Sequence, residues 1–257
     1  MPVTSTVERR TDRHLYHRVT RTGTYGFLSA LPLILMYEVL VVFANQDALT
    51  QVRVGAEVWL KQLFALIGSA GLATFGAAVL IVGFAIFWYE RKQHIPLRPR
   101  FFLWMILESA VYAVIVAILV SGLVGAILTV AASATGVAAL QNVASMNLSL
   151  KLALSIGAGI YEELLFRVIL VGGLFLLARR IAPRRGIAYA IAAIVGAVIF
   201  SWVHYLGPYG DVFTVGSFLF RFFFGLVLNF IFLLRGFGIA AWTHALYDVM
   251  LVVGFLG

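Results

Sequence analysis

The stretch KLALSIGAGIYEELLFRVILVGGLFLLA, residues 151–178, is the part of the sequence that decides the fold. It is long and apolar enough to cross a bilayer, because a membrane-spanning helix needs about 20 mostly apolar residues. Three charged side chains nevertheless lie within six positions near its middle: Glu162, Glu163 and Arg167. Ionised groups inside a bilayer are costly unless they are paired or hydrated, and they often belong to a functional site. The stretch therefore predicts a membrane helix that carries a polar site.

The composition of the whole chain also indicates a membrane protein. Of its 257 residues, 62% are hydrophobic and only 12% are charged, whereas soluble domains average about 25% charged residues. The chain contains no cysteine, which excludes disulfides, thiolate metal ligands and a cysteine nucleophile.

Seven apolar runs are long enough to span a membrane. They are Tyr25–Ala44, Ala70–Tyr89, Phe101–Val130, Leu148–Ala178, Ile187–Leu206, Val212–Leu234 and Phe237–Leu256. The segment Val52–Gly68 is amphipathic and only partly apolar, which is typical of a helix lying at the membrane interface. We therefore predict an all-α fold, a polytopic bundle of about seven transmembrane helices plus one amphipathic interfacial helix.

The basic residues are distributed unevenly between the two sides of these runs. Fourteen of the 19 Lys and Arg residues precede the first run or lie in every second loop, whereas the opposite loops hold only Arg53, Lys61 and Lys151. Because cytoplasmic loops carry the excess of Lys and Arg, the N-terminus is predicted to be cytoplasmic and the C-terminus extracytoplasmic. We expect an integral protein of a bacterial cytoplasmic (inner) membrane. The net charge of +8 is then a topology signal, and no nucleic-acid partner is expected.

Not every charge within the runs points to function. Three charged residues each stand alone in their run, which favours structural ion pairs or contact with water: Glu38, Glu108 and Arg221. Glu163 and Arg167 lie four residues apart and can pair on one helix face. Glu162 lies about 100° away around an α-helix and has no partner close in sequence. A structural salt bridge therefore explains Glu162 poorly, whereas a general base would be such a carboxylate.

Two more patterns at helical spacing occur in later runs. FSWVH places Phe200 and His204 on one helix face, and HALYD places His244 and Asp248 on one face. A single pattern of this kind can occur by chance. Three patterns on three separate runs of one chain predict a shared polar site.

These patterns resemble the three motifs of the CPBP family. EELLFR matches EExxxR, FSWVH matches FxxxH and HALYD matches HxxxN/D, in this order and on separate predicted membrane helices. That family includes the Ras-converting CAAX endopeptidases and bacterial bacteriocin-processing and immunity proteins. The matched region runs from Glu162 to Asp248, and residues 1–150 resemble the family only in their hydrophobic, helical character.

The resemblance implies an intramembrane endopeptidase that hydrolyses a membrane-anchored or lipidated protein or peptide. Glu162 would activate water, and His204 would position that water or carry its proton. His244 and Asp248 would face the oxyanion of the scissile carbonyl. Some members carry Asn where this chain has Asp248, and an ionised Asp cannot donate a hydrogen bond to an oxyanion. Asp248 would therefore be protonated, orient His244 or have another role.

In this interpretation Glu163 and Arg167 orient the site. The chain divides into a basic cytoplasmic segment at 1–24, N-terminal transmembrane helices at 25–147 and a CPBP-like catalytic helix bundle at 148–257. The preferred mechanism needs no cofactor.

Three alternatives remain open from the sequence. A zinc-dependent intramembrane metallopeptidase would use N and O ligands from Glu162, His204, His244 and Asp248, although the HExxH pattern is absent. A non-catalytic immunity or partner-binding membrane protein would be expected to have lost one of these polar residues. A proton-coupled transporter would be expected to contain an internal repeat, and none is visible.

Overall fold

The structure, a computed structural model, describes residues 12–44, 53–65, 71–130, 147–207 and 210–255. Throughout these ranges the regular secondary structure is helical, as predicted. The elements are α2 (Gly23–Ala44), α3 (Gly55–Ala65), α4 (Gly71–Glu90), η1 (Arg91–Gln93), α5 (Pro99–Val130), α7 (Leu148–Gly157), η3 (Ala158–Val171), α8 (Gly172–Ala178), α9 (Arg185–Val203), α10 (Val215–Arg235) and α11 (Phe237–Val252). Residues 12–19 form a further helix before α2.

Four of the described helices are long and apolar enough to cross a membrane: α2, α5, α9 and α10. They coincide with four of the seven predicted runs. Helix α11 is apolar but has only 16 residues. The count of about seven spans therefore stays a prediction, while the polytopic, all-helical class is confirmed.

The predicted interfacial segment forms a helix, α3, but this helix is not an isolated surface element. It packs against α4 and against η3, and its Glu57 side chain is fully buried. Its helical structure is confirmed, and its depth in the membrane stays a prediction.

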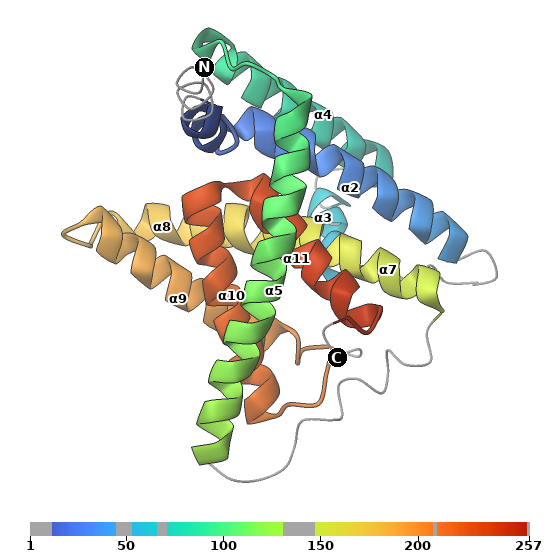
Figure 1. Cartoon of the computed structure of the whole chain (residues 1–257), viewed down its shortest axis with the longest axis vertical. Helices are drawn as coiled ribbons and strands as arrows, with labels where there is room; N and C mark the ends of the chain where they lie inside the picture. Colours follow the sequence, from blue (N-terminus) through green and yellow to red (C-terminus); the bar gives the residue numbers. More distant parts are fainter. Residues whose placement is uncertain (1–11, 45–52, 66–70, 131–146, 208–209, 256–257) are drawn as a thin grey trace, which may run out of the picture.

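Residues 151–178, the apolar stretch that carries Glu162, Glu163 and Arg167, belong to one continuous helix made of α7, η3 and α8. The Asn147 side chain caps its start by accepting a hydrogen bond from the Leu150 amide at 2.7 Å. Its middle part, η3, is π-helical over 14 residues, and π-helical turns are rare and frequently occur at functional sites. In Figure 1 this helix runs across the long axis of the molecule, which α5 follows. Glu162, Glu163 and Arg167 all lie in η3.

Helix α11 lies at the centre of the bundle, where it contacts α2, α5, α7, η3 and α10 (Figure 1). Small residues permit this close packing, as they do in other membrane helix interfaces. At the contact with η3, a Cβ on Gly159 would lie 2.5 Å from Ala245 Cβ and 2.7 Å from the Ala241 carbonyl oxygen. Gly159 therefore sets the distance between the two helices that carry Glu163 and His244.

We expect Gly159→Ala to force η3 and α11 apart and to destabilise the protein by about 1–3 kcal/mol, as overpacking of a core typically does. The measurement is thermal unfolding in detergent. Gly173→Ala is the matched control, because it lies in the same continuous helix and a Cβ there meets nothing within 4 Å. Equal stability of both variants would show that the η3–α11 contact is looser than described.

Candidate active site

The adjacent residues Glu162 and Glu163 of η3 point toward different neighbouring helices. The Glu163 carboxylate is fully buried and lies 2.7 Å from His244 Nδ1 of α11 and 3.0 Å from Arg167 Nε. Glu162 Oε2 lies 3.9 Å from Nε2 of His204, at the C-terminal end of α9. The side chains of Glu162 and His204 are 16% and 23% exposed, so this pair is reachable from outside, whereas Glu163 is not.

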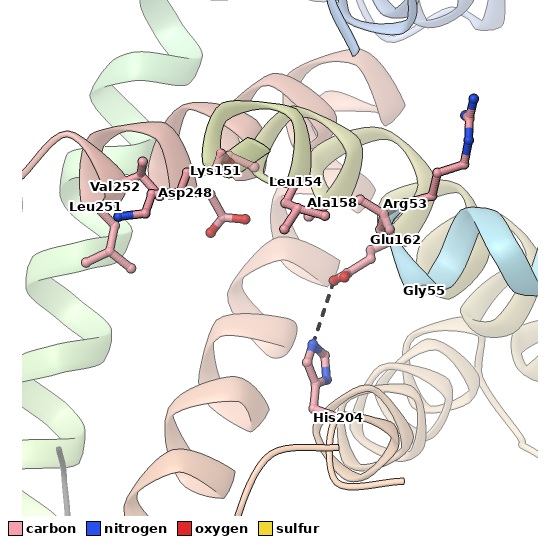
Figure 2. A pocket seen from close by; sticks show the side chains of 12 residues that line it. Arg53, Gly55, Lys151, Leu154, Ala158, Glu162, His204, Asp248, Leu251 and Val252 are labelled. Atoms are coloured by element: carbon pink, nitrogen blue, oxygen red, sulfur yellow. Dashed lines mark hydrogen bonds and ion pairs between the residues drawn. The ribbon is translucent and has the colours of Figure 1, made fainter. Parts of the chain in front are cut away.

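Glu162, His204 and Asp248 line the same cavity of about 520 Å³. Figure 2 shows Glu162 and His204 facing each other across it, with Asp248 on a separate wall. The remaining lining residues are mostly apolar or small and come from α7, α11 and the start of α3. Three helices therefore bring Glu162, His204 and Asp248 to a single cavity, in keeping with the shared polar site that the spacing predicted.

The His204 ring is held in a defined orientation. Its Nδ1 lies 2.7 Å from the Phe200 carbonyl oxygen, and a carbonyl can only accept, so Nδ1 carries the hydrogen. In the neutral imidazole Nε2 is then an acceptor that faces Glu162. The Phe200 ring packs edge-on against His204 at 4.9 Å between ring centroids. The predicted common face of Phe200 and His204 is confirmed.

His244 lies between two carboxylates. Its Nδ1 hydrogen-bonds to Glu163, and its Nε2 lies 3.5 Å from Asp248 Oδ2. The Phe224 ring packs edge-on against it at 5.0 Å. His244 thus connects the buried Glu163 to Asp248 on the cavity wall, and the predicted common face of His244 and Asp248 is confirmed.

The Arg167 guanidinium is buried and compensated in two ways. It contacts Glu163, as the four-residue spacing predicts, and it lies 4.5 Å above the Phe200 ring centroid. Its two terminal nitrogens have no hydrogen-bond partner among the described residues. Arg167 thus contacts Phe200, which packs against His204, and Glu163, which is hydrogen-bonded to His244.

The lone charges of the other helices form ion pairs, as the sequence favoured. Glu108 pairs with Arg235 at 2.6 Å, and Arg221 pairs with Asp211. Glu38 lies 3.3 Å from Arg53. Each of these ion pairs joins two segments of the chain that are apart in sequence.

Two basic residues of the cavity were missed as site residues by the sequence interpretation, which treated them only as loop charges. Arg53 and Lys151 both line the cavity. Lys151 could have been recognised from its position eleven residues before Glu162. Eleven residues make about three helical turns, so the two side chains lie on the same helix face. Arg53 was marked by its spacing of four residues from Glu57.

A protein metal site needs three or more ligands close together. Within the described ranges, no group of three or more His, Asp or Glu side chains is placed to hold a metal ion. His204 has Nδ1 hydrogen-bonded to a carbonyl, and His244 has Nδ1 hydrogen-bonded to Glu163. Histidines that bind a metal commonly make such a bond with their other nitrogen.

The fold and this cluster define a class: a polytopic membrane protein with a polar cavity among its helices. Residues 144–250 match the family model described as type II CAAX prenyl endopeptidase Rce1-like. That range contains all three motifs, so residues 144–250 are similar to the type II CAAX prenyl endopeptidases. No curated protein and no solved structure matches the chain.

Proposed function

We propose that the protein is an intramembrane endopeptidase in which Glu162 activates a water molecule to hydrolyse a peptide bond. The observation that carries this proposal is the approach of Glu162 to His204 within 3.9 Å on the wall of an accessible cavity. A carboxylate and a histidine in this relation are suited to general acid–base chemistry. The family match supports the same reaction class.

In the proposed reaction, water sits to one side of the line between Glu162 Oε2 and His204 Nε2. At a separation of 3.9 Å, a water oxygen can lie about 2.8 Å from both atoms. One of these groups accepts a proton as the water oxygen attacks the scissile carbonyl carbon. Glu162 is assigned this role because an ionised carboxylate is an acceptor only. The proton then passes to the leaving amine as the C–N bond breaks.

The negative charge on the former carbonyl oxygen needs a donor beside it. Asp248 lines the cavity on a wall separate from His204, and His244 is buried with its Nε2 3.5 Å from Asp248 Oδ2. Both residues are assigned this role. His244 Nδ1 carries a hydrogen and donates it to Glu163. A second hydrogen on Nε2 makes the ring a cation, and Nε2 then donates toward Asp248 and the cavity. The buried Glu163 favours that cation, while Arg167 holds Glu163 in place.

The proposed substrate is a membrane-associated, lipidated protein or peptide, in keeping with the CAAX prenyl endopeptidases of the matched family. The proposal is tested with purified protein in detergent and a synthetic prenylated peptide that ends in a CAAX sequence. Mass spectrometry identifies the bond that is cleaved. An intact peptide after prolonged incubation, with folded protein, would favour a non-catalytic partner-binding protein instead.

The role of Asp248 separates water activation by Glu162 from zinc catalysis. If Asp248 orients His244 or serves the oxyanion, an amide of the same shape still offers a donor and an acceptor. Asp248→Asn should then keep substantial activity, whereas Asp248→Ala should lose about 10²-fold, as removal of an oxyanion donor typically does.

The measurement is cleavage by both variants, and by the wild-type protein, with and without a chelator. If Asp248 were a zinc ligand, the neutral amide would be a much poorer ligand and the Asn variant would fail nearly as badly as the Ala variant. That result, together with a wild-type activity that a chelator removes and zinc restores, would replace the proposed mechanism by zinc catalysis.

A further inference from the structure

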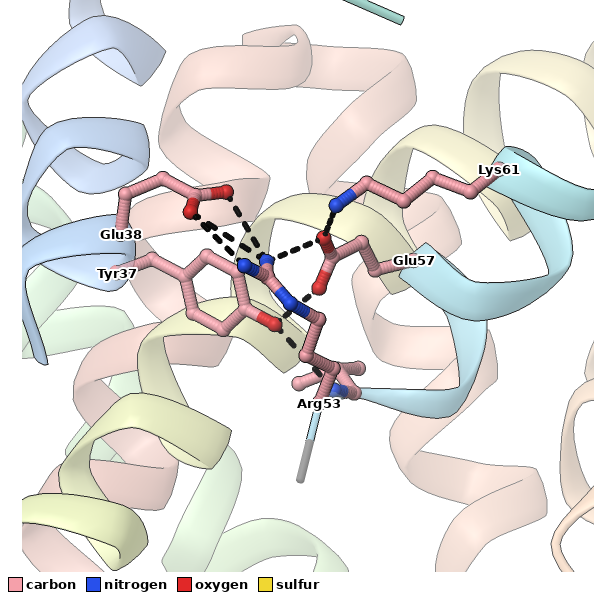
Figure 3. Close-up of polar contacts among 6 residues, drawn as sticks. Tyr37, Glu38, Arg53, Glu57 and Lys61 are labelled. Carbon is pink, nitrogen blue, oxygen red and sulfur yellow. Dashed lines mark hydrogen bonds and ion pairs between the residues drawn. The ribbon is translucent and has the colours of Figure 1, made fainter. Parts of the chain in front are cut away.

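The cavity that holds Glu162 also has a cationic wall that the proposed chemistry does not use. Arg53 and Lys151 both line it. The Arg53 guanidinium contacts Glu38 and lies 2.7 Å from the buried Glu57 carboxylate. Figure 3 shows this guanidinium inside a polar cluster between α2 and α3. These ion pairs therefore fix the Arg53 side chain in position as part of the cavity wall.

The cluster fixes the wall itself. Glu57 also accepts from the Tyr37 hydroxyl of α2 and pairs with Lys61 one turn further along α3 (Figure 3). The Val54 amide donates to the Tyr37 hydroxyl at 3.3 Å. This network holds the start of α3, and with it Val54 and Gly55 of the cavity lining, against α2.

Lys151 lies on the same helix as Glu162 and on the same face. The helix contributes Lys151, Leu154, Ser155, Ala158 and Glu162 to the cavity lining, a spacing of three to four residues that keeps one face of a helix turned toward the cavity. Eleven residues separate Lys151 from Glu162, so their backbones are about 16 Å apart along the axis at 1.5 Å per residue. Figure 2 shows both on the helix that forms the roof of the cavity.

A CAAX substrate would place an anion, its C-terminal carboxylate, at a distance from the scissile bond that matches the separation of Lys151 and Glu162. A CAAX sequence ends three residues after its lipidated cysteine, in a free carboxylate. An extended peptide covers about 3.3–3.6 Å per residue, so that carboxylate lies about 10 Å beyond a bond cleaved next to the cysteine. The flexible four-carbon stem of a lysine bridges the remaining distance from the Lys151 backbone.

We propose that Lys151 binds the free C-terminal carboxylate of the substrate and so sets how many residues lie beyond the scissile bond. This inference rests on the proposed function, because it needs a peptide whose scissile bond lies at Glu162. It adds a specificity residue, on the cavity wall, that takes no part in proton transfer.

The test compares two prenylated peptides of the same sequence, one ending in a free acid and the other in an amide. Wild-type protein should cleave the acid about tenfold more efficiently in kcat/KM, the scale of one hydrogen bond to a charged group. In Lys151→Ala the acid should fall to the level of the amide. Lys92→Ala is the matched control, since Lys92 is an exposed lysine of the turn after α4 and should leave the preference unchanged.

A second measurement does not depend on cleavage. Binding of the same two peptides to Glu162→Gln protein, followed by fluorescence anisotropy, should favour the acid and should lose that preference when Lys151→Ala is added. Equal binding of the two peptides, or binding of neither, would overturn the role of Lys151. A Lys151→Ala loss that is the same for acid and amide would show that Lys151 does not recognise the carboxylate, and it would also overturn the inference. In each of these cases cleavage by the wild type, lost in Glu162→Gln, would leave the proposed function standing.

Discussion

Glu162→Gln should abolish cleavage of a prenylated CAAX peptide, with a loss of at least about 10²-fold, the lower end of what general-base catalysis contributes. The amide has the same shape as the carboxylate but cannot accept the proton of the attacking water. Because Glu162 borders a cavity and is not part of the buried Glu163–Arg167–His244 cluster, the variant should fold normally. The measurement is the rate of product formation by mass spectrometry, with helical content checked by circular dichroism.

The matched control is Glu108→Gln, another carboxylate of a membrane helix with the same 16% exposure, which pairs with Arg235 and does not line the cavity. It should keep most of the wild-type rate. A Glu162→Gln protein that retains more than a few per cent of activity would remove Glu162 as the base.

Glu163→Gln should cause the second large effect, and mainly on stability. Glutamine can still accept the hydrogen bond from His244 Nδ1, but it leaves the buried Arg167 cation without an opposite charge. Breaking one partner of a buried pair typically costs about 3–5 kcal/mol. Thermal unfolding in detergent should therefore show a marked fall in stability.

The double variant Glu163→Gln, Arg167→Met tests the cause of that loss. Removal of both charges should restore much of the stability, because no uncompensated cation remains. Its cleavage activity should stay low, since His244 loses the carboxylate that favours its cationic form. A double variant less stable than Glu163→Gln alone would mean that Arg167 stabilises the bundle through the Phe200 ring more than through Glu163.

The sequence predicted most of the local relations in the site, because they depend on helical spacing alone. Glu163 with Arg167, Phe200 with His204, and His244 with Asp248 are each four residues apart, and each pair is in contact in the structure. The apolar runs of α2, α5, α9 and α10 were likewise readable from length and hydropathy.

The relations between helices could not be predicted in this way. Nothing local in the sequence states that Glu162 turns to α9 while its neighbour Glu163 turns to α11. The divergence itself follows from helical geometry, because adjacent residues lie about 100° apart around an α-helix. Which neighbouring helix each side chain meets depends on tertiary packing, such as the close approach of η3 and α11 at Gly159. For the same reason Lys151 was visible as a charge but not as a cavity residue.

Glu162 and His204 are proposed to act as one unit on a water molecule. The most direct test measures kcat/KM for wild type, Glu162→Gln, His204→Ala and the double variant, with one prenylated peptide. Residues that act together show strongly non-additive losses, so the account predicts that the double variant is no slower than Glu162→Gln alone. A double variant whose loss equals the product of the two single losses would contradict it, because the two residues would then contribute independently.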